Sequence, residues 1–94
     1  MASDFAKIID QLVARRIREQ RVRRGMTQQG LARMIGVAFQ QAHKYERGLS
    51  RVSAGRLFHI ATVLDMPIND FFTENASSAA KQGDPVAVKV HDED

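Results

Sequence analysis

Apolar residues recur at steps of three and four positions through most of the first 73 residues, a spacing that places side chains on one face of an α-helix. The first stripe is long and predicts a helix over about residues 4–24, with Ser3 as its N-cap. The stripe consists of Phe5, Ile8, Ile9, Leu12, Val13 and Ile17. Strand-like alternation is almost absent before residue 84, so the pattern predicts an all-α domain.

Four shorter helices are predicted after the first, which gives five in total. Thr27 and Ser53 are good N-caps, since their hydroxyls can accept a hydrogen bond from a free backbone N–H. Pro67 stops the fourth helix and suits the start of the fifth. The predicted helices cover about residues 28–35 and 39–47, a segment from residue 54 to the stop before Pro67, and residues 68–73. The inward-facing residues of the second and fourth helices are predicted to be Leu31, Ala32 and Ile35, and Leu57, Ile60, Ala61 and Leu64.

Three glycines mark the ends of predicted helices. Gly25, Gly36 and Gly48 each follow an apolar-periodic segment, where a left-handed residue ends a helix and glycine adopts that conformation without penalty. The break at Gly36 leaves room for a turn of three or four residues between two short helices. This is the spacing of a helix-turn-helix.

The residue types around that break fit a helix-turn-helix that reads DNA. Ala32 is small where the two helices touch, and Ala42 and Tyr45 are placed to hold the second helix against the first. The outer face of that second helix is polar, with Gln40, Lys44 and Arg47 on one stripe, flanked by Gln41 and His43. Glutamine and lysine at such positions can bind base edges in a major groove.

Charge divides the chain into two parts. Residues 1–73 hold 12 Lys and Arg against 6 Asp and Glu, a charge of +6, whereas residues 74–94 carry −3, which gives the total of +3. A basic part of this kind favours a polyanionic partner. The 94 residues suffice for one domain, predicted at 1–73, and contain no apolar run that could span a membrane and no apolar signal core. We therefore expect a soluble cytoplasmic protein.

Residues 74–94 are predicted to be a flexible tail. Their first half is small and polar, which is typical of a linker or of disorder. Val86, Val88 and Val90 then alternate with other residues and leave open a short strand that forms only against a partner.

The sequence offers no chemistry for an enzyme or a metal site. It has no cysteine, and His43, His59 and His91 share no metal-ligand spacing. No pairing of nucleophile and base and no phosphate-binding loop is present. We expect no cofactor and no catalytic activity.

The stretch from Thr27-Gln28-Gln29-Gly30-Leu31-Ala32 to Tyr45-Glu46-Arg47-Gly48 resembles the Cro/repressor-type (XRE-type) helix-turn-helix family. The family pattern is a T-Q-x-x-L-A opening, a glycine followed by Val or Ile at the turn, and a Y-E-x-G close, and all three stand here in order. The likeness covers about residues 13–72. It implies five α-helices, a DNA-reading unit formed by the second and third, and binding as a homodimer to a pseudo-palindromic operator.

The resemblance also implies roles for individual residues. Gln28 falls where the family's glutamine meets a phosphate, and Phe39, Gln40 and Lys44 fall on base-reading positions. Gln41 is a further candidate for base contact, and Arg47 falls where relatives touch the DNA backbone. Arg21 and Glu46 fall on positions that pair between the first and third helices. Arg51 and Arg56 flank the start of the fourth helix, whose positive dipole end suits a phosphate. Phe39 could instead complete the core.

Three departures from the family pattern affect the helix-turn-helix, one of which is Ala42 in place of a larger aliphatic residue. Gly30 takes a helical position usually held by Glu or Lys, which costs about 1 kcal/mol of helix propensity relative to Ala. Ala38 replaces the Ser or Thr that usually caps the third helix.

The first helix contains six arginines. We expect two or three of them to lie near phosphate, Arg21 to be structural and the others to be solvated. They are Arg15, Arg16, Arg18, Arg21, Arg23 and Arg24.

The leading hypothesis is a sequence-specific transcriptional regulator that binds double-stranded DNA. The alternatives are an antitoxin of the same fold, whose tail binds a toxin, and a bridging module that contacts polymerase. We expect the homodimer to meet around the fifth helix near Phe71 and Phe72. Phe5, Ile8 and Ile9 add apolar surface at the N-terminal end of the first helix.

Overall fold

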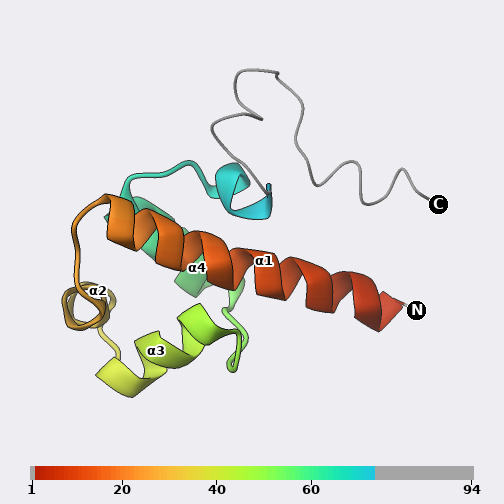
Figure 1. Ribbon diagram of the computed structural model, residues 1–94, viewed down its shortest axis with the longest axis horizontal. Coiled ribbons are helices and arrows are strands. Elements are labelled where there is room, and N and C mark those ends of the chain that lie inside the picture. Colours follow the sequence, from red (N-terminus) through yellow and green to blue (C-terminus); the bar gives the residue numbers. More distant parts are fainter. Residues whose placement is uncertain (1, 74–94) are drawn as a thin grey trace.

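A computed structural model describes residues 2–73 of the chain, with side chains from Asp4 onward, and this part is all-helical. The long α1 is the axis of the molecule, with α2 and α3 on one side of it and η1 on the other (Figure 1). The alternating valines at 86, 88 and 90 lie outside the described residues. The elements are α1 (Ala2–Arg23), α2 (Gln28–Ile35), α3 (Phe39–Arg47), α4 (Ala54–Leu64) and the 3₁₀ helix η1 (Ile68–Phe72).

The predicted capping residues hold the ends of α2 and α4. Thr27 Oγ1 accepts a hydrogen bond from the Gly30 N–H at 2.9 Å, and Ser53 Oγ accepts one from the Arg56 N–H at 3.1 Å. Gly25, Gly36 and Gly48 all have left-handed φ angles near +70° (+71°, +74° and +72°), as predicted. The bounds of α2 and α3 match the expected ranges because these signals mark both ends of the helix-turn-helix.

Two predicted features of the helices are wrong. Ser3 lies inside α1, which begins at Ala2, so it is not the N-cap. Helix ends are weakly specified where small residues suit both the cap and the first turn. The fifth element is a 3₁₀ helix that ends at Phe72, closed by a hydrogen bond from the Asp70 N–H to the Pro67 carbonyl at 2.9 Å. Five residues are too few to nucleate a stable α-helix, and the tighter 3₁₀ turn is common in such short pieces.

The core forms where helices α1 to α4 and η1 meet, and α3 contributes Tyr45 to it. Its largest fully buried side chains are Ile17, Leu31, Ile60, Leu64 and Phe71. The inward residues predicted for α2 and α4 are all buried. Phe71 is 0% exposed and fixes η1 to the core, so its side chain is not available for the dimer contact expected around the fifth helix.

The N-terminal turns of α1 extend beyond the other helices (Figure 1). Leu12, Val13 and Ile17 are buried, but Phe5 and Ile8, on the same predicted stripe, are 46% and 52% exposed. The apolar stripe of α1 is therefore longer than the surface that the described residues provide to cover it.

Polar residues of α1 join it to the end of α4 and to η1. Arg16, predicted to lie on the surface, is only 3% exposed, and its Nε donates to the Asp70 carbonyl at 3.2 Å. Gln20 is also buried, and its Nε2 donates to the Leu64 carbonyl at 3.0 Å. These side chains satisfy carbonyls at helix ends that have no partner within the helix.

Candidate nucleic-acid interface

A tight turn joins α2 to α3 and fixes the angle between them. Gly36 ends α2 in the left-handed conformation, and the Val37 N–H returns to the Ala32 carbonyl at 2.9 Å. Ala32 and Ala42, which are 3% and 0% exposed, are the small buried residues of the two helices. Arg56 Nη1 donates to the Ile35 carbonyl at 2.6 Å, so α4 holds the last turn of α2. The sequence had suggested a phosphate as the partner of Arg56.

One side of α3 is buried and the other faces solvent. Ala42, Tyr45 and Glu46 are buried. Gln41 lies between the two sides and is partly buried. The exposed residues are Phe39, Gln40, His43, Lys44 and Arg47, which we call the reading face.

Phe39 lies on the surface at the first position of α3. Its side chain is 45% exposed and stacks on the His43 ring, with ring centroids 6.4 Å apart and an angle of 29° between the planes. Because the spacing of the two residues is four, they are neighbours on the helix. The sequence left two roles open for Phe39, contact with a base or a place in the core. The exposure of the ring contradicts a place in the core.

Arg21 and Glu46 are brought together, linking α1 to α3. Arg21 Nε lies 2.6 Å from Glu46 Oε2, and its Nη2 donates to Oε1 at 3.1 Å, which makes the pair bidentate. The Glu46 side chain is 0% exposed and that of Arg21 12%. Arg21 Nη1 also donates to the Met26 carbonyl at 2.7 Å. The carboxylate is thus paired where solvent does not reach it.

Gln28 continues this connection to the reading face. Its Nε2 donates to Glu46 Oε1 at 3.0 Å, and its Oε1 lies 3.3 Å from His43 Nδ1. An amide oxygen can only accept, so the proton of this hydrogen bond belongs to His43 Nδ1. The Gln28 side chain, which was expected at a phosphate, therefore joins Glu46 and His43 of α3. The second proton of Nε2 takes no part in these two contacts.

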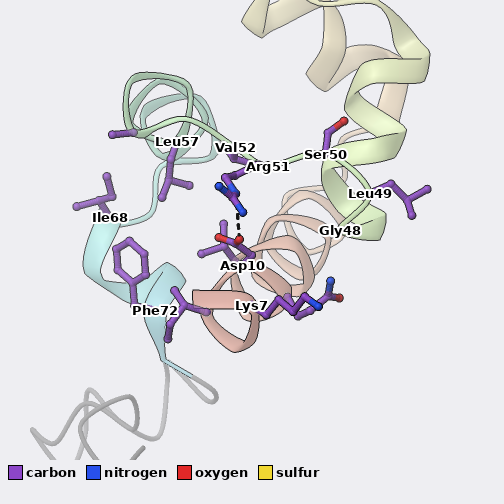
Figure 2. Close-up of a pocket in the computed structure, with 14 residues that line it drawn as sticks. Lys7, Asp10, Gly48, Leu49, Ser50, Arg51, Val52, Leu57, Ile68 and Phe72 are labelled. Atoms are coloured by element: carbon purple, nitrogen blue, oxygen red, sulfur yellow. Dashed lines mark ion pairs between the residues drawn. The ribbon is translucent and has the colours of Figure 1, made fainter. Parts of the chain in front are cut away.

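The two outer arginines have different surroundings. Arg47 is exposed at the last position of α3. Arg51 lies on the loop between α3 and α4, where its Nε is 3.3 Å from Asp10 Oδ2 of α1 (Figure 2). The Arg51 side chain is 79% exposed and that of Asp10 is 40% exposed. Such exposed pairs contribute at most about 1 kcal/mol. Arg51 can therefore exchange this carboxylate for another anion at low cost.

A groove of about 680 Å³ lies beside this ion pair, between the N-terminal half of α1, the loop after α3, and η1 (Figure 2). The Asp10–Arg51 pair is part of its lining. Its apolar lining includes Ile9, Val13, Val52, Leu57, Ile68 and Phe72. The groove is lined by different residues from those of the reading face.

The sequence predicted no role for His43, which stands beside the polar stripe. Its spacing of four from Phe39 was a signal for the ring contact, but its hydrogen bond to Gln28 depends on how α2 and α3 pack. Within residues 2–73, no group of three His, Cys, Asp or Glu side chains is placed to hold a metal, and no helix is long and apolar enough to cross a membrane.

Comparison with known proteins agrees with this geometry. The profile of the family described as helix-turn-helix matches residues 17–71. An uncharacterized transcriptional regulator in the ATPase CF(0) region of Rhodospirillum rubrum is 46% identical over 77 residues, which are 82% of this chain and 67% of that protein. An uncharacterized HTH-type transcriptional regulator of Sinorhizobium medicae is 39% identical over 79 residues, 84% of this chain and 57% of that protein. The chain thus spans a little over half to two thirds of these relatives.

A solved structure shows the same fold. The clp gene regulator ClgR from Corynebacterium glutamicum superposes with a TM-score of 0.68 at 27% identity, and the match covers 80% of each chain. The match and the relatives support the resemblance found in the sequence.

Proposed function

The chain belongs to the helix-turn-helix family, and from this we propose that it is a sequence-specific transcriptional regulator that binds a pseudo-palindromic operator in double-stranded DNA as a homodimer. The observation that carries the proposal is the reading face of α3. It presents amide and cationic groups to solvent while the Arg21–Glu46 pair holds the helix against α1. We further propose that residues 1–73 are the DNA-binding domain.

In this proposal α3 lies in the major groove. Gln40 and Lys44 are exposed one turn apart and read base edges, since Gln can form two hydrogen bonds to adenine and Lys can donate to guanine. The partly buried Gln41 lies beside them and reaches a base or the adjacent sugar. Base contacts of this kind specify the sequence, whereas contacts to phosphate position the protein.

Phosphate contacts are assigned to residues at the edges of the helix-turn-helix. Gln28 is the first residue of α2, where backbone N–H groups without helical partners and the helix dipole both favour an anion. Arg47 ends α3, and Arg51 follows on the loop and exchanges Asp10 for phosphate. Each contact adds affinity that is independent of sequence and falls with salt.

The homodimer surface is assigned to the N-terminal part of α1 and the adjacent groove. Phe5 and Ile8 expose about half of their surface, and the apolar groove with Phe72 lies along the same half of α1. Exposed apolar side chains and an apolar groove on the same half of one helix are typical of a protein–protein interface. A second copy that covers it would complete the two-fold arrangement that a palindromic operator requires.

The antitoxin alternative depends on the valines at 86–90, outside the described residues. A second chain that copurifies with this one at a fixed ratio would favour it over a regulator that acts without a protein partner.

Selection of binding sites from random duplex DNA tests the proposed function. The expected result is one enriched half-site that occurs twice in inverted orientation, with centres about 10–10.5 base pairs apart or a multiple of this. Retention of random DNA with no enriched sequence would contradict it, and would favour a module that contacts protein or binds DNA without reading it.

A further inference from the structure

Phe39 is the one apolar side chain among the five residues of the reading face. It stands at the N-terminal end of α3, the end at which recognition helices of this kind contact base edges. Lys44 and Arg47 on the same face are exposed and cationic, so the partner that meets this face is an anion. In the major groove the apolar group on a base edge of unmodified DNA is the C5 methyl of thymine.

The Phe39 ring is held in place before any DNA arrives. It stacks on His43, and His43 Nδ1 donates to Gln28 Oε1 at 3.3 Å. Gln28 in turn donates to the buried Glu46, which is paired with Arg21. A surface ring supported in this way loses less rotamer freedom on binding than a free one, which raises affinity for a group that fits it.

We propose that Phe39 and His43 form a thymine-recognition pair. Phe39 contacts the C5 methyl of one thymine in each half-site, and His43 is the positioning residue that holds the Phe39 ring. This inference rests on the proposed function and adds to it the identity of one base in the operator.

Replacement of thymine by uracil tests this contact, because it removes the methyl group and leaves the hydrogen-bonding groups unchanged. Each thymine of the selected half-site is replaced in turn by deoxyuracil, and the dissociation constant is measured. For the wild-type protein we expect about fourfold weaker binding per half-site at one thymine, from the loss of one buried methyl group. The Phe39→Ala variant should bind the thymine and uracil operators equally. Gln40→Ala, a matched change on the same face, should keep the uracil effect.

The positioning role of His43 has its own readout. His43→Ala should reduce the ratio of uracil to thymine dissociation constants, and His43→Phe, which preserves a stacking ring, should restore part of it. A change that only weakens folding lowers affinity for both operators and leaves this ratio unchanged.

The results of these experiments distinguish a failure of the thymine contact from a failure of the proposed function. An enriched, symmetric half-site at which the wild-type protein loses nothing at any uracil overturns the thymine pair and leaves the regulator intact. A uracil effect that persists in Phe39→Ala also overturns it. If no half-site is enriched, the proposed function fails and the inference fails with it.

Discussion

Glu46 is the residue at which the core and the reading face of α3 are joined. Its side chain has no exposed surface and accepts hydrogen bonds from both Arg21 and Gln28. Removal of one partner from a buried ion pair leaves the other charge without compensation, which costs far more than the loss of a surface pair. The residue therefore affects stability and DNA binding through the same contacts.

The Glu46→Ala variant should be less stable by about 3–5 kcal/mol, measured by urea denaturation, because the Arg21 guanidinium loses its carboxylate. DNA affinity should fall as well, since Gln28 loses an anchor. Arg24→Gln is the matched control: it breaks the 3.7 Å pair of Arg24 with Asp65, whose side chains are 46% and 79% exposed, and should change stability by under about 1 kcal/mol. An unfolding midpoint that Glu46→Ala leaves unchanged would contradict a structural role for the pair.

Gly48 is required at the end of α3 by its backbone conformation. Its φ angle is +72°, whereas the atom nearest to a Cβ built there, Gln11 Nε2 of α1 at 2.6 Å, is the end of an exposed side chain that can move aside. Gly48→Ala should therefore destabilise the protein by about 1–3 kcal/mol in thermal or urea denaturation. Gly55→Ala serves as the control, because a Cβ at Gly55 in α4 meets no atom within 4 Å, and it should stabilise by about 0.5–1 kcal/mol. Equal effects of the two changes would show that backbone conformation is not the reason for Gly48.

At the scale of elements, α2 could be predicted to the residue because Thr27 and Gly36 are strong local signals at its two ends. The 3₁₀ form of η1 could not be predicted, since a short apolar segment after proline suits either helix, and the burial of Phe71 decides how it packs. At Gly30, which departs from the family pattern, a Cβ would lie 3.1 Å from Thr27 Oγ1, so a side chain there requires a small shift of the hydroxyl that caps α2.

The start of α3 is the least supported helix end in the helix-turn-helix. Ala38 is its N-cap, has the extended backbone of a cap (φ −69°, ψ 154°), and makes no side-chain hydrogen bond to the helix. Ala38→Ser should stabilise the protein by about 0.5–2 kcal/mol in urea denaturation, and Ser53→Ala should lose a similar amount at α4. No gain from Ala38→Ser alongside a loss from Ser53→Ala would mean that another group already satisfies the first turn of α3.

Across the whole molecule, the helix-turn-helix and the Arg21–Glu46 pair could be predicted from the sequence, whereas the other contacts around the candidate interface could not. The exposed positions of Gln40 and Lys44 follow from helical periodicity and could be predicted. The burial of Arg16 and the contact of Gln28 with His43 could not, because both depend on where separate helices meet. The position of Arg51 beside Asp10 depends on the loop after α3, for which sequence has no periodic signal.

The proposed dimer surface makes a prediction about association. Ile8→Glu places a charge on the exposed end of α1 and should shift a dimer toward monomer in sedimentation at tens of micromolar protein, because burying an unpaired charge is costly. Phe58→Glu is the control, since Phe58 is 64% exposed on α4 and does not line the groove. A wild-type protein that sediments as a monomer both with and without DNA would exclude the dimer.

The proposed function requires that α3 lies in the major groove with Gln40 toward the bases and Arg47 over the backbone. The most direct test measures affinity for the selected operator and its single-base variants over a range of salt concentrations, for Gln40→Ala and Arg47→Ala. Gln40→Ala should lose about 1–3 kcal/mol of discrimination at one or two positions and keep the salt slope. Arg47→Ala should weaken all sequences alike and make the log–log salt slope shallower by about 1 per half-site. A changed sequence preference in Arg47→Ala, with uniform weakening in Gln40→Ala, would contradict this placement of α3.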